Sequence, residues 1–421
     1  MNPKVFENPI HKFKLNNGLN VHLIPTNSQI TFVQLDIPIG GITLRYEKDG
    51  IINQVIPGSA HFLEHKIFAT PEGDGFQKLS TFGVSANAMT TYQTTSYTIN
   101  GHENILLSVI YLIKMLDEPY FTDKNVASER KIINEEIQMY DDDPDTIIDR
   151  KLFSQLLYNH PLLNDILGTK ADIKEISKES LLKLHQDFYL NENRQLLIIG
   201  PIDVYEYEKV LKENFNTYKE TSSVIIKKTE EPKEVKLKQD KLYLDVFMPS
   251  ISIGFKYIHQ KLDYLSRYKN SMIMSFLMRL LFGKQSSFSD QMIKKGYMNS
   301  NFDFDMTNEE QLLLYVIDVN TKNYEKIKEE FINYFFNEAL NELTHENFEI
   351  MKRGYLGGYL MELDDIETKL YLYGKFNLNQ MTIEDAIQTI KDITLDDVIA
   401  LYQSFNDDMI SYLFTLPKDK K

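Results

Sequence analysis

The sequence predicts an α+β protein built from two similar halves. In each half, short strand-like segments alternate with long helical segments, and the second half repeats the outline of the first. A polar, charged stretch without a helical stripe separates the two halves. The chain has 421 residues, enough for two domains that each have a core. We therefore expect domains at residues 1–218 and 235–421, joined by a linker at residues 219–234.

The first half opens with predicted strands. Residues 13–25 predict a short hairpin, because strand-like segments flank a turn at residues 16–18. Residues 31–39 predict another strand, and residues 85–99, rich in Thr, Ser and Tyr, predict one strand or a pair. The rest of this half is expected to form four helices, then a strand and a last helix, at residues 103–117, 122–141, 144–157, 174–187, 194–199 and 205–215.

The second half is expected to use the same kinds of element. Its predicted strands lie at residues 235–255, 311–317 and 410–416. Its predicted helices lie at residues 262–282, 321–342, 344–362 and 383–404. Strands separated by long helices in two similar halves fit a duplicated α+β domain.

Composition excludes several classes of function. The chain is 43% hydrophobic and 25% charged, as in ordinary globular proteins. It has no cysteine, so a metal would be held by histidine and carboxylate, and a reducing cytosol is a fitting location. The net charge of −15 argues against nucleic acid and anionic membranes as partners. The longest apolar stretches, 105–116 and 272–282, are too short to span a bilayer, so we expect a cytoplasmic protein.

The segment 58–66 carries the sequence H-x-x-E-H, the inverzincin pattern. On a helix, His61 and His65 are four residues apart and project from one face, with Glu64 on the same side. Two neutral imidazoles can hold a divalent metal while a neighbouring carboxylate activates water. The flanks suit a helix start, with Ser59 as a possible cap. The alternative is a partly buried helix that carries two histidines by chance.

A catalytic zinc usually needs a third protein ligand. Within residues 125–140, Glu129, Ile133 and Glu136 share one helical stripe. A carboxylate on an inward stripe is costly unless a positive group meets it, and a metal would meet it. We expect Glu136 to be the ligand and Glu129 to orient a histidine or the ligand. Glu135 is the rival, about 100° round the helix, and a solvated acidic face is the alternative interpretation.

Three segments together resemble the M16 (pitrilysin/insulinase) zinc peptidases, especially their small bacterial YmfH-like members and the processing-peptidase type of subunit. The segments are 58–68, 85–97 and 129–145. M16 members combine H-x-x-E-H with a distant glutamate and a second glutamate shortly before it. Here 71 residues separate His65 from Glu136, and seven separate Glu129 from Glu136.

The resemblance implies the M16 peptidase/LuxS-like fold, with two homologous domains that each contain a mainly antiparallel sheet flanked by helices. It implies a zinc endopeptidase that degrades or processes small or unfolded peptides in a clamshell chamber. Zinc would be held by His61, His65 and Glu136, with Glu64 as general base and Glu129 as a supporting acid. In M16 peptidases an edge strand pairs with the substrate backbone, which makes Asn87 and Ala88 candidate substrate contacts.

One feature of the family is missing from the second half. That half has no second H-x-x-E-H, so only the first domain is expected to be catalytic. M16 enzymes also carry an Arg and a Tyr seven residues apart that polarise the scissile carbonyl, and Met292 and Asn299 occupy the matching positions. Either Lys294 or Tyr297 substitutes for the pair, or a second M16-like subunit supplies it. We favour a two-subunit enzyme, with a homodimer as the other option.

A non-catalytic M16-like interaction subunit is the competing function. A degenerate copy has no reason to keep His61, Glu64, His65, Glu129 and Glu136 together, and this chain keeps all five. A metal hydrolase for small molecules fits the duplicated halves poorly. The sequence therefore favours the peptidase, and it leaves the identity of the peptide and of the cleaved bond open.

Overall fold

A computed structural model describes residues 5–418 except residues 7, 191, 193, 219–222, 262 and 301. By packing, the chain forms two units that are not contiguous in sequence. Unit 1 consists of Met1–Met139, Asn164–Lys228 and Glu362–Ile383. Unit 2 consists of Tyr140–Leu163, Thr229–Met361 and Glu384–Lys421. Each half of the chain thus contributes one segment to the unit formed mainly by the other half: residues 140–163 belong to unit 2 and residues 362–383 to unit 1.

The predicted domain boundaries, residues 1–218 and 235–421, stay a prediction, because packing units that exchange segments do not test them. The first four residues of the predicted linker lie outside the described residues. The main change from unit 1 to unit 2 comes between Lys228 and Thr229.

Unit 1 contains a six-stranded sheet with strand order β1-β2-β10-β3-β9-β8. The strands are β1 (His11–Lys14), β2 (Asn20–Pro25), β3 (Thr31–Ile37), β8 (Ser85–Thr90), β9 (Thr95–Gly101) and β10 (Gln195–Gly200). All neighbours are antiparallel except β2 and β10. The predicted hairpin at residues 13–25 is confirmed, and residues 85–99 form a pair of strands. Strand β8 is the edge of the sheet.

One face of this sheet carries the core of unit 1. Val33, Leu35 and Ile37 alternate along β3 and join a buried apolar cluster with residues of the covering helices. The helices of unit 1 outside α13 are α1 (Ser59–Ile67), α2 (Gly75–Ser80), α3 (Ile105–Asp117), α4 (Asp123–Asp141), α6 (Lys170–Glu175), α7 (Lys178–Phe188) and α8 (Val204–Asn214). Short strand pairs complete the unit: β4 (Arg45–Lys48) and β5 (Ile51–Gln54) with β11 (Ile225–Ile226), and β6 (Ala69–Thr70) with β7 (Gly73–Asp74).

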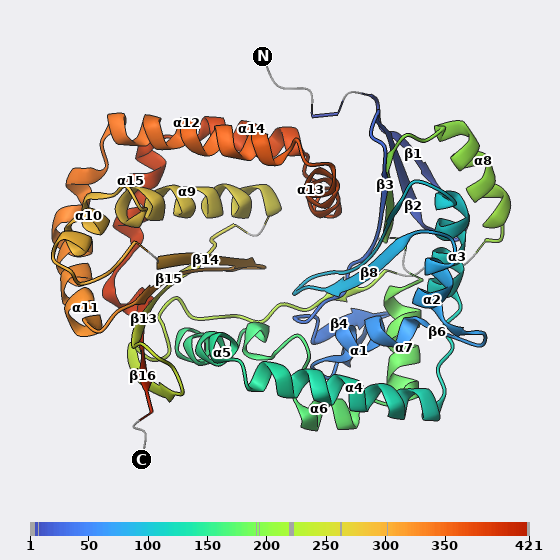
Figure 1. Cartoon of the computed structure of the whole chain (residues 1–421), viewed down its shortest axis with the longest axis horizontal. Coiled ribbons are helices and arrows are strands. Elements are labelled where there is room, and N and C mark those ends of the chain that lie inside the picture. The colour runs from blue at the N-terminus through green and yellow to red at the C-terminus, as the bar shows by residue number, and fades with distance from the viewer. Residues whose placement is uncertain are drawn as a thin grey trace. The chain divides into compact units, whose positions relative to one another are not determined.

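The second face of the sheet is polar and is covered by helix α13 (Ile366–Leu378), which comes from the C-terminal half (Figure 1). The carboxylate of Asp36 lies buried on this face and accepts hydrogen bonds from Ser96 Oγ at 2.6 Å, Gln195 Nε2 at 2.8 Å and Gln34 Nε2 at 2.9 Å. Gln195 Nε2 also donates to the backbone oxygen of Gly374 at 2.9 Å. Hydrogen bonds from sheet to helix therefore fix α13 on the sheet.

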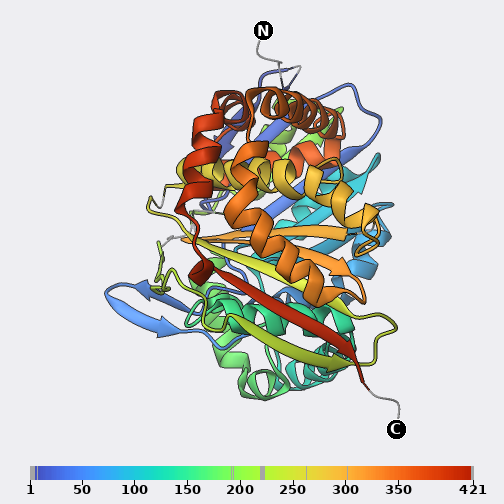
Figure 2. The same cartoon turned by 90° about the vertical axis from the view of Figure 1, so that its left-hand side faces the viewer.

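Unit 2 repeats the sheet of unit 1 with one strand fewer. Its order is β12-β16-β13-β15-β14, again with one parallel pair, β12 and β16. The strands are β12 (Gln239–Leu244), β13 (Ser250–Ile258), β14 (Phe302–Glu309), β15 (Leu312–Asn320) and β16 (Ile410–Pro417). Figure 2 shows the red β16 strand between β12 and β13. The equivalent strands and directions confirm the predicted α+β fold in two similar halves.

The helices of unit 2 include one from the N-terminal half, α5 (Pro144–Leu156), which packs on β12, β13 and β16. The others are α9 (Tyr264–Phe282), α10 (Ser287–Lys294), α11 (Tyr324–Asn333), α12 (His345–Glu362), α14 (Ile383–Asp392) and α15 (Leu395–Ser404). Short helical turns lie at Pro161–Leu163 in the exchanged segment, at Tyr334–Glu338 and Ala339–Glu342 after α11, and at Asp407–Met409 before β16.

Some predicted elements differ from the structure. The predicted helix at residues 174–187 is two helices, because Ser177 begins α7 with a capping box, and residues 383–404 are likewise divided at Thr394. The predicted helix at residues 321–342 ends its regular part at Asn333 and continues as π and 3₁₀ turns. The β4–β5 hairpin, α10, β14 and α13 were not predicted from the sequence.

Replacing Gly374 by alanine tests how closely α13 approaches the sheet. A Cβ atom there would lie 2.7 Å from Leu197 Cδ1 and 2.9 Å from both Asp36 Oδ2 and Gln34 Nε2. Overpacking costs about 1–3 kcal/mol, which outweighs a gain of about 1 kcal/mol in helix propensity. We expect Gly374→Ala to lower the free energy of unfolding measured in urea.

The matched control is Gly357→Ala in α12, where a Cβ atom would meet nothing within 4 Å. It should raise the free energy of unfolding by up to about 1 kcal/mol. Equal effects of the two substitutions would show that α13 does not pack closely on the sheet.

Candidate metal centre

Helix α1 carries the histidine motif and lies almost entirely inside unit 1. It begins after Gly58, whose φ of 86° is left-handed and where a Cβ atom would lie 2.3 Å from Leu167 O. Phe62 and Leu63 are fully buried beneath it. The expectation that Ser59 caps this helix is wrong, since Gly58 is the N-cap and Ser59 is a buried residue of the first turn.

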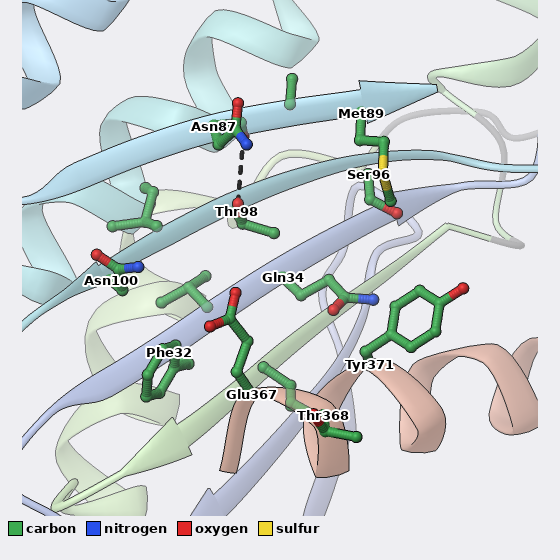
Figure 3. Close-up of a pocket in the computed structure, with 14 residues that line it drawn as sticks. Phe32, Gln34, Asn87, Met89, Ser96, Thr98, Asn100, Glu367, Thr368 and Tyr371 are labelled. Atoms are coloured by element: carbon green, nitrogen blue, oxygen red, sulfur yellow. Dashed lines mark hydrogen bonds between the residues drawn. The ribbon is translucent and has the colours of Figure 1, made fainter. Parts of the chain in front are cut away.

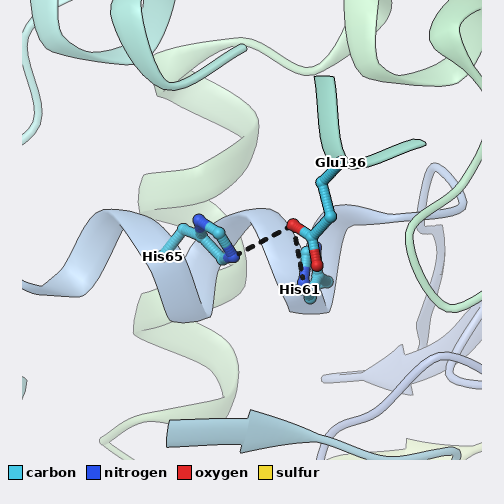
Figure 4. A group of neighbouring side chains, drawn as sticks. All are labelled: His61, His65 and Glu136. Carbon is cyan, nitrogen blue, oxygen red and sulfur yellow. Dashed lines mark ion pairs between the residues drawn. The ribbon is translucent and has the colours of Figure 1, made fainter. Parts of the chain in front are cut away.

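Three side chains, two from this helix and one from α4, meet at one place (Figure 4). Glu136 Oε2, from α4, lies 3.7 Å from His61 Nε2 and 3.6 Å from His65 Nε2. One ligand atom from each of the three residues lies within 4.8 Å of the other two. These separations are too long for hydrogen bonds, but they suit atoms that each lie about 2.0–2.2 Å from one zinc ion. Two imidazoles and a carboxylate are also the donor types of catalytic zinc sites, so the residues fit this metal.

Glu129 contacts both the ring of His65 and the side chain of Lys66. Glu129 Oε1 lies 3.3 Å from His65 Nδ1, and Lys66 Nζ donates to Glu129 Oε2 at 2.9 Å. Burial alone would raise the pKa of Glu129, but the hydrogen bonds from His65 and Lys66 outweigh it and lower the pKa. Glu129 is therefore charged at neutral pH, and it lies at Nδ1 of the ring whose Nε2 is 3.6 Å from Glu136 Oε2.

The two histidines differ in their electrostatic surroundings. Burial, together with the neighbouring His65, lowers the pKa of His61 to about 3, so its imidazole is neutral, as a metal ligand must be. Burial also lowers the pKa of His65, but the hydrogen bond with Glu129 and the charges of the nearby carboxylates outweigh it and raise the pKa. His61 Nδ1 is buried without a hydrogen-bond partner among the described residues.

Glu64 is buried beside these residues and is held by the end of the edge strand. Thr90, the last residue of β8, donates from Oγ1 to Glu64 Oε2 at 2.8 Å. Burial raises the pKa of Glu64, and the hydrogen bond from Thr90 acts in the opposite direction. A carboxylate with a raised pKa suits proton transfer near neutral pH. Thr90 thus links the edge strand directly to the candidate metal centre.

The remaining predicted site residues lie as follows. Glu135, the rival ligand, is exposed and is not part of the group of three. Asn87 is exposed on edge strand β8, whereas Ala88 is half-buried and packs against the core. In unit 2, Met292 is buried in α10, and Lys294 is paired with Asp290 at 2.5 Å.

The contacts of Lys66 and Thr90 with the site were not predicted from the sequence. Lys66 directly follows the second histidine of the motif, and its burial beside Glu129 needs a helix that is distant in sequence. Thr90 ends a predicted strand segment, but nothing in the sequence connects it with Glu64. Both roles depend on tertiary contacts.

Comparison with known proteins assigns the family. The family model described as "Insulinase (Peptidase family M16)" matches residues 45–170, and the model described as "Peptidase M16 inactive domain" matches residues 175–355. The chain is 31% identical over 390 residues to the protein named "Uncharacterized zinc protease YmfH" of Bacillus subtilis, covering 91% of both chains. The chain belongs to the M16 peptidase family.

Solved structures share this fold over nearly the whole chain. A putative M16-like peptidase from Alicyclobacillus acidocaldarius has a TM-score of 0.90 and 25% sequence identity, covering 99% of this chain and 100% of that one. A protease from Helicobacter pylori has a TM-score of 0.81 and 20% identity, covering 97% of this chain and 99% of that one. Across the described residues, none of the helices has the length and apolar character needed to cross a membrane.

Glu129→Gln tests whether this glutamate orients His65. The substitution keeps the size of the side chain but removes the charge that faces both His65 and Lys66. Loss of such a supporting contact to a metal-binding histidine typically lowers metal affinity about 10–100-fold. We expect a decrease of this size in zinc affinity, measured by competition with a chromophoric chelator.

Glu135→Gln is the matched control on the same helix. Its side chain is exposed, so zinc affinity should stay unchanged. Equal zinc affinity in both variants would rule out the orienting role of Glu129.

Proposed function

We propose that this protein is a zinc-dependent metalloendopeptidase that hydrolyses small or unfolded peptides. The proposal rests on one observation, the convergence of His61 Nε2, His65 Nε2 and Glu136 Oε2 beside the buried carboxylate of Glu64. The names of relatives agree with it, since YmfH of Bacillus subtilis is named a zinc protease.

The residues of the site would divide the work of peptide hydrolysis. His61, His65 and Glu136 would hold zinc, which when bound polarises a carbonyl and lowers the pKa of water to about 7. Glu64 would accept a proton from the attacking water and then donate it to the leaving amine. Thr90 would fix the direction of the Glu64 carboxylate through the bond it donates at 2.8 Å. Glu129 would keep His65 in the binding orientation.

Strand β8 would bind the substrate backbone. It is the edge of the unit 1 sheet, so its outer N–H and C=O groups are available to an added strand. Asn87 and Ala88 lie in the middle of this strand and would be the main contacts. Backbone pairing would satisfy the N–H and C=O groups of any extended peptide. Because Thr90 at the end of β8 contacts Glu64, a peptide paired with β8 would lie close to Glu64.

Glu64→Gln tests the role of the general base. The amide cannot accept the proton, so we expect a loss of hydrolysis of about 10²–10⁴-fold, measured with internally quenched peptides. Zinc content, measured by elemental analysis, should stay that of the native protein, because Glu64 is not in the group of three.

Two histidine variants provide the comparison. His61→Ala should lose both zinc and activity, whereas His102→Ala, which changes an exposed histidine, should lose neither. Retained hydrolysis in Glu64→Gln would show that the base is wrongly assigned. Native protein that takes up no zinc would favour a non-catalytic interaction subunit instead.

We also propose that a second M16-like chain completes the active enzyme. By the resemblance to M16 peptidases, Met292 and Asn299 would occupy the positions of the Arg and Tyr pair. Lys294, one alternative donor, is paired with Asp290. We expect native mass spectrometry of the active material to show a complex of two different chains, the second with the Arg and Tyr pair. A fully active monomer or homodimer would contradict this proposal.

A further inference from the structure

A cavity of about 340 Å³ lies between the edge of the unit 1 sheet and helix α13 (Figure 3). Its volume is at the lower end of the range for ligand pockets. All of its lining belongs to unit 1, including the segment 362–383. The side chains come from three strands and one helix: β3, β9, β8 and α13.

The lining of the cavity combines polar and apolar side chains. The strands contribute amide and hydroxyl groups, from Gln34, Ser96 and Thr98 among others. Apolar surface comes from Phe32 and Leu370, among others. This combination suits a long side chain with an apolar stem and a polar end, because the stem can pack while the end is hydrogen-bonded.

Among the described residues that line the cavity, Glu367 is the only charged one. Figure 3 shows its carboxylate extending from α13 towards the strands. Within the described part of the chain, no ion pair occupies this carboxylate, which lies in the first turn of α13. A cationic side chain in the cavity would therefore be attracted, and an acidic one would be repelled.

The ring of Tyr371 adds a second feature that favours a cation. It lies one turn after Glu367 on α13 and is exposed at the cavity. The face of a tyrosine ring attracts ammonium and guanidinium groups. Glu367 and Tyr371 together present a carboxylate and an aromatic face from one side of the helix.

The cavity lies on the face of β8 opposite to the candidate metal centre. Asn87 and Met89 are exposed on the cavity face, whereas Ala88 and Thr90 point to the other face, where Thr90 contacts Glu64. In a peptide added to β8, residues opposite Asn87 and Met89 would direct their side chains to the cavity face. At about 3.3 Å per residue, these positions lie within about 10 Å of Thr90 along the strand.

We propose that this cavity selects a lysine or arginine side chain of an extended peptide paired with β8, within three residues of the bond that is cut. The proposal rests on the proposed peptidase function and assigns its substrate class as basic peptides. Glu367 is the specificity-determining residue, and it comes from the half of the chain that lacks the metal motif.

Binding of labelled peptides to the full-length Glu64→Gln protein tests the assignment. Fluorescence anisotropy would compare extended peptides that carry lysine, norleucine or glutamate at one central position. A partly exposed charge pair supports a preference of about three- to tenfold for lysine over norleucine, decreasing at high salt. Adding Glu367→Gln should remove the preference. With Glu367→Lys instead, the protein should bind the glutamate peptide more tightly than the norleucine peptide.

The matched control is Glu362→Gln, which removes an exposed carboxylate of the same unit that does not line the cavity. It should keep the preference for lysine. Equal affinities for lysine and norleucine, or a preference that survives Glu367→Gln, would overturn the inference.

Hydrolysis by the protein with Glu64 intact separates this inference from the proposed function. Equal rates of cleavage for the lysine and norleucine peptides would support the peptidase function and contradict the role proposed for the cavity. The opposite outcome is a lysine preference in binding that Glu367→Gln abolishes, together with no cleavage of any peptide. It would support the cavity assignment and contradict the peptidase function.

Discussion

The candidate metal centre depends on how helix α4 packs against helix α1. The imidazole of His65 lies between two carboxylates of α4, with Glu129 at Nδ1 and Glu136 at Nε2. These glutamates are seven residues apart, close to two helical turns, so both point to the same side. Ile133 and Ile137 are buried on the inner face of α4 and hold it against the core. A shift of one residue in this packing would remove both carboxylates from the ring.

The parts of the site that are predictable from sequence are those fixed by helical spacing. The pair His61 and His65 and the stripe of Glu129 and Glu136 need only the period of the α-helix. The meeting of the two helices follows from the resemblance to M16 peptidases and not from the spacing itself. Lys66 and Thr90 could not be predicted, since their roles arise from contacts across distant segments.

Helix α13 is an element of the fold that could not be predicted from the sequence for a similar reason. Its large apolar residues include Leu370, Leu372 and Phe376, without a clear polar stripe, because it packs on a polar sheet face and not on an apolar core. The divided helices are a different case. The capping boxes at Ser177 and Thr394 are local signals, and they were present in the sequence.

The two sheets share strand order, but their second faces have diverged. In unit 2, a Cβ atom at Gly254 would touch Leu152 and Leu156 of α5, so that contact is apolar. In unit 1, the contact with α13 is made through Gln195 and the buried carboxylate of Asp36. A fragment that stops before residue 362 would therefore keep His61, His65 and Glu136, the candidate metal ligands, and yet leave Asp36 uncovered. Separately expressed halves are thus poor substitutes for the intact chain.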